Sequence, residues 1–231
     1  MEILLTASSF YEIQALVGEM ELVENLGNNY ARFRFHNQEI DVLISGIGSG
    51  IASYHLTRAL MTKSYDRVLG TGLCYALPEK LESGSLVHVI DDQYGDLGYW
   101  GDDGFQTLFD LRVIRQDEFP FHRGILENNE SFSPTVNELP KVTGITLNSI
   151  SGEVLGLERM FHKYLADVVS MDGAASFYCC MNEKLPCFQV RVVTNNPKEL
   201  IKPASIDSCF SNDLCDRLRQ ILEEWNAEDE S

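Results

Sequence analysis

The stretch IDVLISGIGSG, residues 40–50, decides the class of fold. Its apolar first half, Ile40–Ile44, is typical of a strand covered on both faces, as in a parallel or mixed sheet. Glycines then end the strand, and residues 51–61 carry apolar side chains at helical spacing. A strand that passes through glycines into a helix indicates an α/β domain. Residues 45–50 match neither the dinucleotide fingerprint nor a P-loop, so the residues alone favour a tight structural turn over a ligand-binding one.

The same alternation of strand and helix extends along most of the chain. Apolar runs predict strands at residues 3–6, 30–36, 68–71, 85–90, 144–148, 167–170 and 186–194. Helical spacing predicts helices at residues 11–20, 51–61 and 154–164, from the region of Asp172 onward, and at 206–225. Residues 91–104 and 119–139 are predicted to be loops. Because no linker or repeat interrupts the pattern, we expect one domain over residues 1–226, followed by a frayed acidic tail at 227–231.

Charge and composition exclude several classes of partner. The 231 residues include 18 Lys and Arg against 35 Asp and Glu, a formal charge of −17. This charge would repel nucleic acid and anionic membrane surfaces, so neither is expected as a partner. No apolar run approaches the roughly 20 residues that span a bilayer, and the N-terminus lacks the features of a signal peptide. The cysteines form no CxxC pair and the histidines no ligand pattern, so metal-ligand spacing is absent and we expect a reduced, cytoplasmic protein.

Two later segments place polar side chains where sheets commonly bind ligands. Asp172 lies where residues 170–175, SMDGAA, begin a helix. Spacing alone favours a charge that suits the helix dipole, and the alternative is a carboxylate that points into a pocket. Arg191 lies inside the apolar strand at 186–194, where a buried guanidinium needs a carboxylate, and Asp172 and Glu12 are the candidates. Asn195 ends that strand, at a position that suits either a ligand or a turn.

Taken in order, these segments resemble the purine nucleoside phosphorylase/nucleosidase superfamily. The first strand and Glu12 are similar to that family's first strand and the glutamate after it. Residues 45–48, SGIG, and 70–72, GTG, resemble its two glycine turns. Residues 170–175 resemble its MEGAA segment, and residues 191–195, RVVTN, its R-x-I-S-[DN] segment. The resemblance covers nearly the whole chain.

Within the superfamily, the resemblance is strongest to the futalosine hydrolases of the alternative menaquinone pathway. Asn195 stands where adenosine-type nucleosidases have aspartate. Residues 144–148, GITLN, resemble the GITVN strand of that family, and residues 96–98, DLG, resemble its ELGxED-type loop. The resemblance implies a homodimer or higher homo-oligomer of single α/β domains, each with a mixed, partly barrel-like central sheet flanked by helices. It also implies that water hydrolyses the N-ribosidic bond of a 6-oxopurine nucleoside, futalosine above all, without a metal or organic cofactor.

The resemblance also implies roles for single residues. Cleavage of an N-riboside builds positive charge on the sugar and negative charge on the departing base. Glu12 would orient or deprotonate the attacking water, and Met171 and Asp172 would hold the ribose. Asn195 would bond the purine edge as donor and acceptor, which suits a 6-oxopurine, while Arg191 would hold a carboxylate in place. The other residues expected to bind substrate are Gly46, Gly72 and Asn148.

Departures from the family pattern keep two other functions open. Asp172 is one methylene shorter than the family's glutamate, and residues 72–76, GLCYA, replace a segment rich in glycine and alanine. Residues 196–199, NPKE, replace its Val-x-x-Arg continuation. One alternative is therefore a nucleoside-binding protein that has lost the reaction. The other is a phosphate-dependent phosphorylase, although the two glycine turns contain no Lys or Arg that could hold phosphate.

Overall fold

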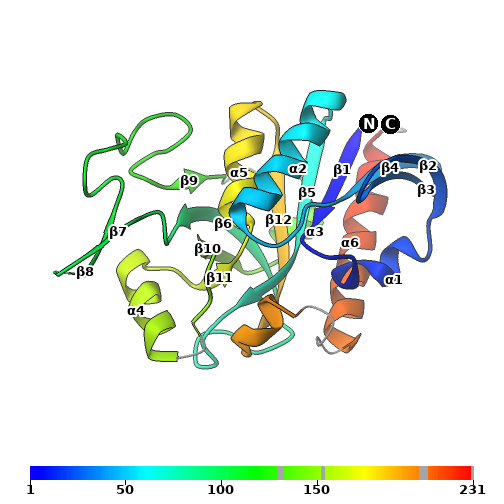
Figure 1. Ribbon diagram of the computed structural model, residues 1–231. Helices are drawn as coiled ribbons and strands as arrows, with labels where there is room; N and C mark the ends of the chain where they lie inside the picture. Colours follow the sequence, from blue (N-terminus) through cyan, green and yellow to red (C-terminus); the bar gives the residue numbers. More distant parts are fainter. Residues whose placement is uncertain (103, 129–132, 152–153, 203–207, 230–231) are drawn as a thin grey trace.

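Strands and helices alternate along the chain in the computed structural model, which describes residues 1–102, 104–128, 133–151, 154–202 and 208–229 (Figure 1). The strands are β1 (Ile3–Ala7), β2 (Glu21–Gly27), β3 (Tyr30–Phe35), β4 (Gln38–Ile44), β5 (Arg67–Tyr75), β6 (Leu86–Tyr94), β7 (Gly98–Gly101), β8 (Gly104–Thr107), β9 (Leu126–Glu127), β10 (Lys141–Thr146), β11 (Val168–Ser170) and β12 (Cys187–Thr194). The helices are α1 (Gln14–Val17), α2 (Ser49–Thr62), α3 (Pro134–Asn137), α4 (Val154–Tyr164), α5 (Gly173–Asn182) and α6 (Ser208–Asp229), with the 3-10 turns η1 (Phe10–Glu12) and η2 (Pro197–Leu200).

The central sheet is mixed and partly closed on itself. Ten strands form it in the order β11-β10-β6-β12-β5-β1-β4-β3-β2, with β9 paired to β6. β5 runs parallel to β1 and to β12, whereas β12 runs antiparallel to β6. One further pairing, between Val169 of β11 and Tyr75 of β5, joins the first strand of this order to the fifth. This closure confirms the expected mixed, partly barrel-like sheet.

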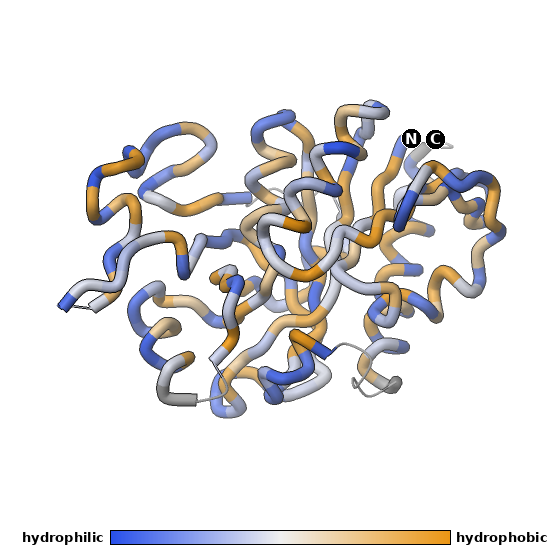
Figure 2. The backbone as a smooth tube through the Cα atoms, viewed as in Figure 1, coloured by the Kyte–Doolittle hydropathy of each residue, from blue (hydrophilic) through white to orange (hydrophobic). Residues whose placement is uncertain are grey.

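Apolar side chains cover both faces of the open part of the sheet. In β1, Ile3 and Leu5 belong to the core cluster that contains α6, whereas Leu4 belongs to the cluster that contains α2 and α5. In Figure 1, α2 and α5 lie side by side, and α6 lies beyond β1. Figure 2 shows hydrophilic and hydrophobic residues alternating along α6, as expected for a helix with one buried face. The continuous apolar strands of the sequence thus lie between two helical layers.

Both predicted loops contain regular structure. Over residues 91–104, β6 continues to Tyr94, and β7 and β8 then form a hairpin in which the rings of Trp100 and Phe105 lie 5.3 Å apart. The loop prediction was wrong there because an acidic residue can lie within a strand when a neighbouring side chain forms a hydrogen bond to its carboxyl group. The Thr146 hydroxyl group forms such a bond to Asp92. Over residues 119–139, β9 and α3 interrupt the loop.

Other differences concern the ends of elements. The predicted helix at 11–20 consists of η1 and the one-turn helix α1, and β2 was not predicted because its largely exposed residues form no apolar run. α4 coincides with the predicted residues 154–164, whereas α6 continues to Asp229, beyond the expected end at Trp225. Residues 103, 129–132, 206–207 and 230–231 of the predicted segments lie outside the described residues. In the described part of the chain, none of the helices is both long and apolar enough to cross a membrane.

Candidate active site

The carboxyl group of Glu12 is buried where β1 gives way to η1, and the residue is 1% exposed. The Ser8 hydroxyl lies 3.0 Å from both carboxyl oxygens. The Ser9 N–H donates to Oε2 at 2.7 Å, and the Leu73 N–H of β5 donates to Oε1 at 3.1 Å. Because each oxygen has its own backbone donor, the orientation of the carboxyl group is fixed.

Gly72 makes room for this carboxyl group. Its φ is +141°, and a Cβ at this position would lie 2.9 Å from Oε1 of Glu12. A larger residue would therefore push the Glu12 side chain out of its place. Gly46, the other predicted glycine, has a φ of +88°, and its Cβ would lie 2.5 Å from Cγ2 of Ile51 in α2. Gly72 thus borders Glu12, whereas Gly46 shapes the turn into α2.

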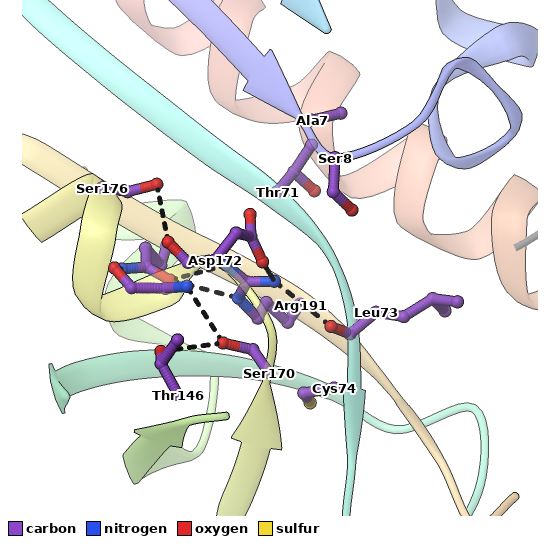
Figure 3. A network of polar contacts seen from close by, with 12 residues as sticks. Ala7, Ser8, Thr71, Leu73, Cys74, Thr146, Ser170, Asp172, Ser176 and Arg191 are labelled. Atoms are coloured by element: carbon purple, nitrogen blue, oxygen red, sulfur yellow. Dashed lines mark hydrogen bonds and ion pairs between the residues drawn. The ribbon is translucent and has the colours of Figure 1, made fainter. Parts of the chain in front are cut away.

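Arg191 is buried in β12 and paired with Asp172, which is one of the two carboxylates that the sequence offered as partners. Nη1 of Arg191 lies 3.0 Å from Oδ1 of Asp172, and their side chains are 2% and 6% exposed. Nε and Nη2 donate to Oε1 of Gln189 at 3.1 and 2.9 Å. Nη1 also donates to the Leu73 carbonyl at 3.2 Å (Figure 3). The guanidinium is therefore held on several sides, and so is the carboxylate that it contacts.

The peptide of Leu73 joins the two carboxyl groups into one network. Its N–H donates to Glu12, and its carbonyl accepts from Arg191, which pairs with Asp172. Among the described residues, nothing donates to Oδ2 of Asp172, and Figure 3 shows this oxygen pointing away from Arg191. The network brings together Glu12, Leu73, Arg191 and Asp172, and it leaves Oδ2 of Asp172 without a donor among the described residues.

The electrostatic surroundings of Glu12 suit proton transfer. Burial, and secondly the negative charge of Asp172, raise the pKa of Glu12 from 4.5 to about 7, against hydrogen bonds from Ser9, Ser8 and Leu73 that lower it. A carboxyl group with this pKa can accept and release a proton near neutral pH. The arrangement is therefore competent for general base catalysis.

A third buried carboxyl group, Asp92, was not predicted as a site residue. It is 1% exposed, and burial raises its pKa to about 7, although the charge of Arg191 and a hydrogen bond from Thr146 oppose this. Asp92 lies in the stretch predicted as loop. The available signal was the apolar alternation of Val87 and Val89, which continues the strand through the acid. In the described part of the chain, no three His, Cys, Asp or Glu side chains are grouped as metal ligands would be.

Asn195 lies beyond the end of β12 and is bonded to the loop that follows β5. Its Nδ2 donates to the carbonyls of Ala76 and Leu81 at 2.8 and 3.0 Å. Both amide hydrogens are thus used within the protein, and Oδ1 is the group that remains for a ligand. No hydrogen bond among the described residues joins Asn195 to Glu12 or Asp172.

Asn148 lies at the rim of a separate pocket of about 520 Å³. Its Oδ1 accepts from the N–H of Ser49 at 2.9 Å, and its backbone N–H and Nδ2 donate to Asp96 at 2.6 and 3.1 Å. Tyr94 and Tyr178 line the same pocket. Asn148 therefore joins the start of α2 to the loop after β6.

Met171 lies in the turn between β11 and α5, half-buried against the core. The Leu147 N–H donates to the Ser170 carbonyl at 3.0 Å. Asn148 follows Leu147 in the chain, and Met171 follows Ser170. Among the described residues that line the pocket of Asn148, however, neither Met171 nor Asp172 is found.

Tyr75, the bulkiest departure from the family pattern, is buried in the hydrophobic core. It is 1% exposed, and its ring lies 6.1 Å from that of Phe161 in α4. Its backbone also pairs with Val169 at the point where the barrel closes. The tyrosine therefore contributes to packing at the seam between β5 and β11.

Replacing Glu12 with glutamine should change how stability depends on pH. The folded protein keeps the Glu12 proton up to about pH 7, whereas the unfolded chain releases it near 4.5. The free energy of unfolding therefore falls as the pH rises between these values, by about 3 kcal/mol for this group. Urea unfolding of wild type and Glu12→Gln at about pH 5 and about pH 8 measures this contribution.

Glu24→Gln, at an exposed position of β2, is the matched control, and it should follow wild type at both pH values. If the difference between wild type and Glu12→Gln were the same at both pH values, Glu12 would not be a buried group that titrates near neutrality.

Asn195→Asp should destabilise the protein at neutral pH. The aspartate cannot donate to the Ala76 and Leu81 carbonyls, and its charge would face both of them. We expect a loss of about 2–3 kcal/mol at neutral pH and a smaller loss in acid, where the carboxyl group is protonated. Asn25→Asp is the control, because the exposed Asn25 side chain accepts from the Gly27 N–H and an aspartate would do the same. Chemical unfolding that showed no loss for Asn195→Asp would mean that the amide is not needed as a link.

Comparisons with known proteins place this fold. The family model described as the phosphorylase superfamily matches residues 3–224. A 5′-methylthioadenosine/S-adenosylhomocysteine nucleosidase of Maridesulfovibrio salexigens is 23% identical over 231 residues, which cover 87% of this chain and 100% of that protein. An aminodeoxyfutalosine nucleosidase of Helicobacter pylori is 24% identical over 211 residues, which cover 83% and 86%.

The fold is also that of a solved structure. The native futalosine hydrolase of Helicobacter pylori superimposes with a TM-score of 0.78 at 18% identity, over 97% of this chain and 98% of that one. At this identity the likeness concerns the fold. The family match, in contrast, extends from β1 into α6 and includes every segment of the polar network. The chain therefore belongs to the phosphorylase superfamily.

Proposed function

We propose that the protein hydrolyses the N-ribosidic bond of purine nucleosides, with water as the co-substrate. The observation that carries the proposal is the network in which Leu73 joins the buried Glu12 to the pair of Arg191 and Asp172. Membership of the superfamily and two relatives that are nucleosidases by name support this reaction class. The network supplies a group that accepts a proton and a group that accepts hydrogen bonds.

Glu12 acts on the water. As the bond between ribose and base weakens, positive charge develops on the sugar, and water attacks the carbon that held the base. The ionised carboxylate of Glu12 orients this water and takes its proton as the new carbon–oxygen bond forms. Its negative charge also stabilises the cationic sugar. The two backbone donors hold the carboxylate in one orientation throughout.

Asp172 holds the sugar. Its Oδ2, to which no described residue donates, accepts from the ribose hydroxyls, while Arg191 holds Oδ1. Because the pair is almost completely buried, the carboxylate cannot turn towards solvent without leaving the guanidinium unpaired. Met171, which precedes it, packs against the apolar face of the sugar. Arg191 thereby positions Asp172 and does not itself bind the nucleoside.

The finer proposal is that the substrate is futalosine, in menaquinone biosynthesis. The two segments that resemble futalosine hydrolases, residues 96–98 and 144–148, are joined by the hydrogen bonds between Asp96 and Asn148. Asp96, Leu97 and Asn148 of these segments line one pocket, where a large group on the ribose 5′ carbon finds room. Oδ1 of Asn195 accepts from an N–H on the edge of the 6-oxopurine. The described cysteines are buried free thiols, which agrees with the reducing cytoplasm as the location.

A homodimer is part of the same proposal. Ile51, Tyr54 and Met61 of α2 are 54%, 58% and 73% exposed, and their spacing places them along one face of the helix. A second copy of the chain would cover this apolar face. We expect sedimentation to show a dimer that Tyr54→Glu converts to a monomer. Leu165→Glu, at an exposed leucine outside α2, is the control and should leave the dimer intact. A monomeric wild type would contradict this part of the proposal.

A nucleoside panel tests the function. Purified protein is incubated with futalosine, inosine and 5′-methylthioadenosine, with and without phosphate, and free base is measured by chromatography. We expect hypoxanthine from futalosine without phosphate, and kcat/KM should fall as the pH drops below about 7, because Glu12 must be ionised. Glu12→Gln should lower kcat by at least roughly 100-fold. Glu24→Gln should not lower it.

Two outcomes would favour the alternatives. Release of base that depends on phosphate would identify a phosphorylase, although Arg191, the cation of the described network, is already occupied by Asp172, Gln189 and Leu73. A nucleoside that raises the unfolding temperature without any release of base would identify a binding protein. In that case Asp172→Glu, which restores the longer side chain, should restore turnover.

A further inference from the structure

Asp172 occupies the N-cap position of α5, but its side chain does not cap the helix. An aspartate at this position ordinarily accepts from the second or third N–H of the helix. Here Oδ1 accepts from Arg191 and lies in the polar network. The first N–H groups of α5 are buried with the helix, so they need acceptors from elsewhere.

Two hydroxyl groups take over the capping. The Gly173 N–H donates to Oγ of Ser170 at 3.0 Å, and the Ala174 N–H donates to Oγ1 of Thr146 at 2.7 Å. Ser170 immediately precedes the turn, whereas Thr146 comes from β10, a different strand of the barrel. Figure 3 shows both hydroxyl groups on the side of the turn away from the free oxygen of Asp172.

Asp92 orients the Thr146 hydroxyl. The Thr146 hydroxyl group donates its one proton to Oδ1 of Asp92 at 3.0 Å. The proton therefore points at Asp92, and Oγ1 of Thr146 is left to accept from Ala174 and from Ser170, which lies 3.3 Å away. Thr146, Ser170 and Asp92 are 0%, 2% and 1% exposed, so water does not replace these bonds.

Asp92 also lies directly beneath the first turn of α5. A Cβ added at Gly173 would lie 2.2 Å from Oδ2 of Asp92. The carboxylate thus approaches the positive end of the helix dipole, which suits its charge. The small residue at 173 is required for this approach, so the Asp92–Thr146 pair and the glycine of the SMDGAA segment form one packing unit.

We propose that Thr146, oriented by Asp92, is a positioning residue for Asp172. By capping α5 from β10, it leaves the carboxylate of Asp172 free to pair with Arg191 and to hold the ribose. The same carboxylate cannot cap the helix and face the sugar at once, so the two roles compete for one side chain. The link to ribose rests on the proposed function, whereas the capping claim concerns the protein alone.

Loss of the Thr146 hydroxyl should therefore redirect Asp172. In Thr146→Val the Ala174 N–H becomes a buried donor without an acceptor, and rotation of the Asp172 side chain into ordinary N-cap geometry satisfies it. That rotation turns Oδ2 of Asp172, the oxygen not bonded to Arg191, away from the ribose. Because misplacement of about 1 Å can cost 10²-fold, we expect kcat to fall roughly 10- to 100-fold. KM should change less, because the contact with the ribose matters most in the transition state.

Two variants control this experiment. Thr146→Ser keeps the hydroxyl and should stay within roughly 3-fold of wild type in kcat. Thr143→Val removes a hydroxyl from the same strand that donates to the Leu165 carbonyl, away from α5, and should leave kcat unchanged. A role for Thr146 in stability alone would lower the unfolding temperature of Thr146→Val without lowering kcat of the folded enzyme, and this result would overturn the proposal.

The crystal structure of Thr146→Val gives a second test that does not depend on activity. We expect Oδ2 of the Asp172 carboxylate within hydrogen-bond distance of the Ala174 N–H. If Oδ2 does not approach the Ala174 N–H, the capping claim is wrong, whatever the rates. Thr146→Ala, which also removes the hydroxyl group that accepts from the Ala174 N–H, provides the same test should the valine variant not fold. If wild type cleaves no nucleoside, the proposed function fails while the structure still decides the capping claim.

Discussion

The guanidinium of Arg191 must be satisfied inside the sheet, and the arrangement around it follows from that requirement. A buried charge without partners is strongly destabilising. Gln189, two positions earlier on the same face of β12, accepts a hydrogen bond from Nη2 of the guanidinium. Asp172, at the start of α5, accepts one from Nη1. The Leu73 carbonyl of β5 completes the set. One side chain thus ties β12, β5 and α5 together at the point where the barrel and the open sheet meet.

Two further buried acids near this pair, Glu12 and Asp92, have pKa values raised chiefly by burial. Asp172 is in contact with Arg191, whereas Glu12 and Asp92 are buried without a cation of their own, and the pKa of each is raised to about 7. Hydrogen bonds from backbone N–H groups and from the Thr146 hydroxyl hold the two in place. The site therefore contains one carboxylate fixed by an ion pair and two carboxyl groups that titrate close to neutrality. In the proposed reaction, this division separates binding of the sugar from transfer of the proton.

The sequence predicts local features well and long-range partners poorly. Apolar runs and helical spacing locate β4, α4 and β12, because periodicity depends on neighbouring residues. The need of a buried guanidinium for a carboxylate narrows the partner of Arg191 to Asp172 or Glu12 from the sequence alone. In contrast, the acids at 91 and 92 resemble loop residues in the sequence. Thr146, which forms a hydrogen bond to Asp92, is far away along the chain, so no neighbouring residue indicates this partner. The sequence also does not predict that both amide hydrogens of Asn195 bond to the carbonyls of residues 76 and 81. A family resemblance identifies the position of Asn195 but says nothing about its hydrogen-bond partners.

The claim that Glu12 and Asp172 act on one sugar can be tested most directly with a crystal structure of the protein bound to a purine nucleoside analogue that is not cleaved. We expect a ribose hydroxyl oxygen about 2.6–3.2 Å from Oδ2 of Asp172, and a water at similar distance from the Glu12 carboxylate that faces the carbon bonded to the base. A nucleoside that occupies the pocket of Asn148 alone, with its ribose in contact with neither carboxylate, would show that the two acids do not act on one sugar.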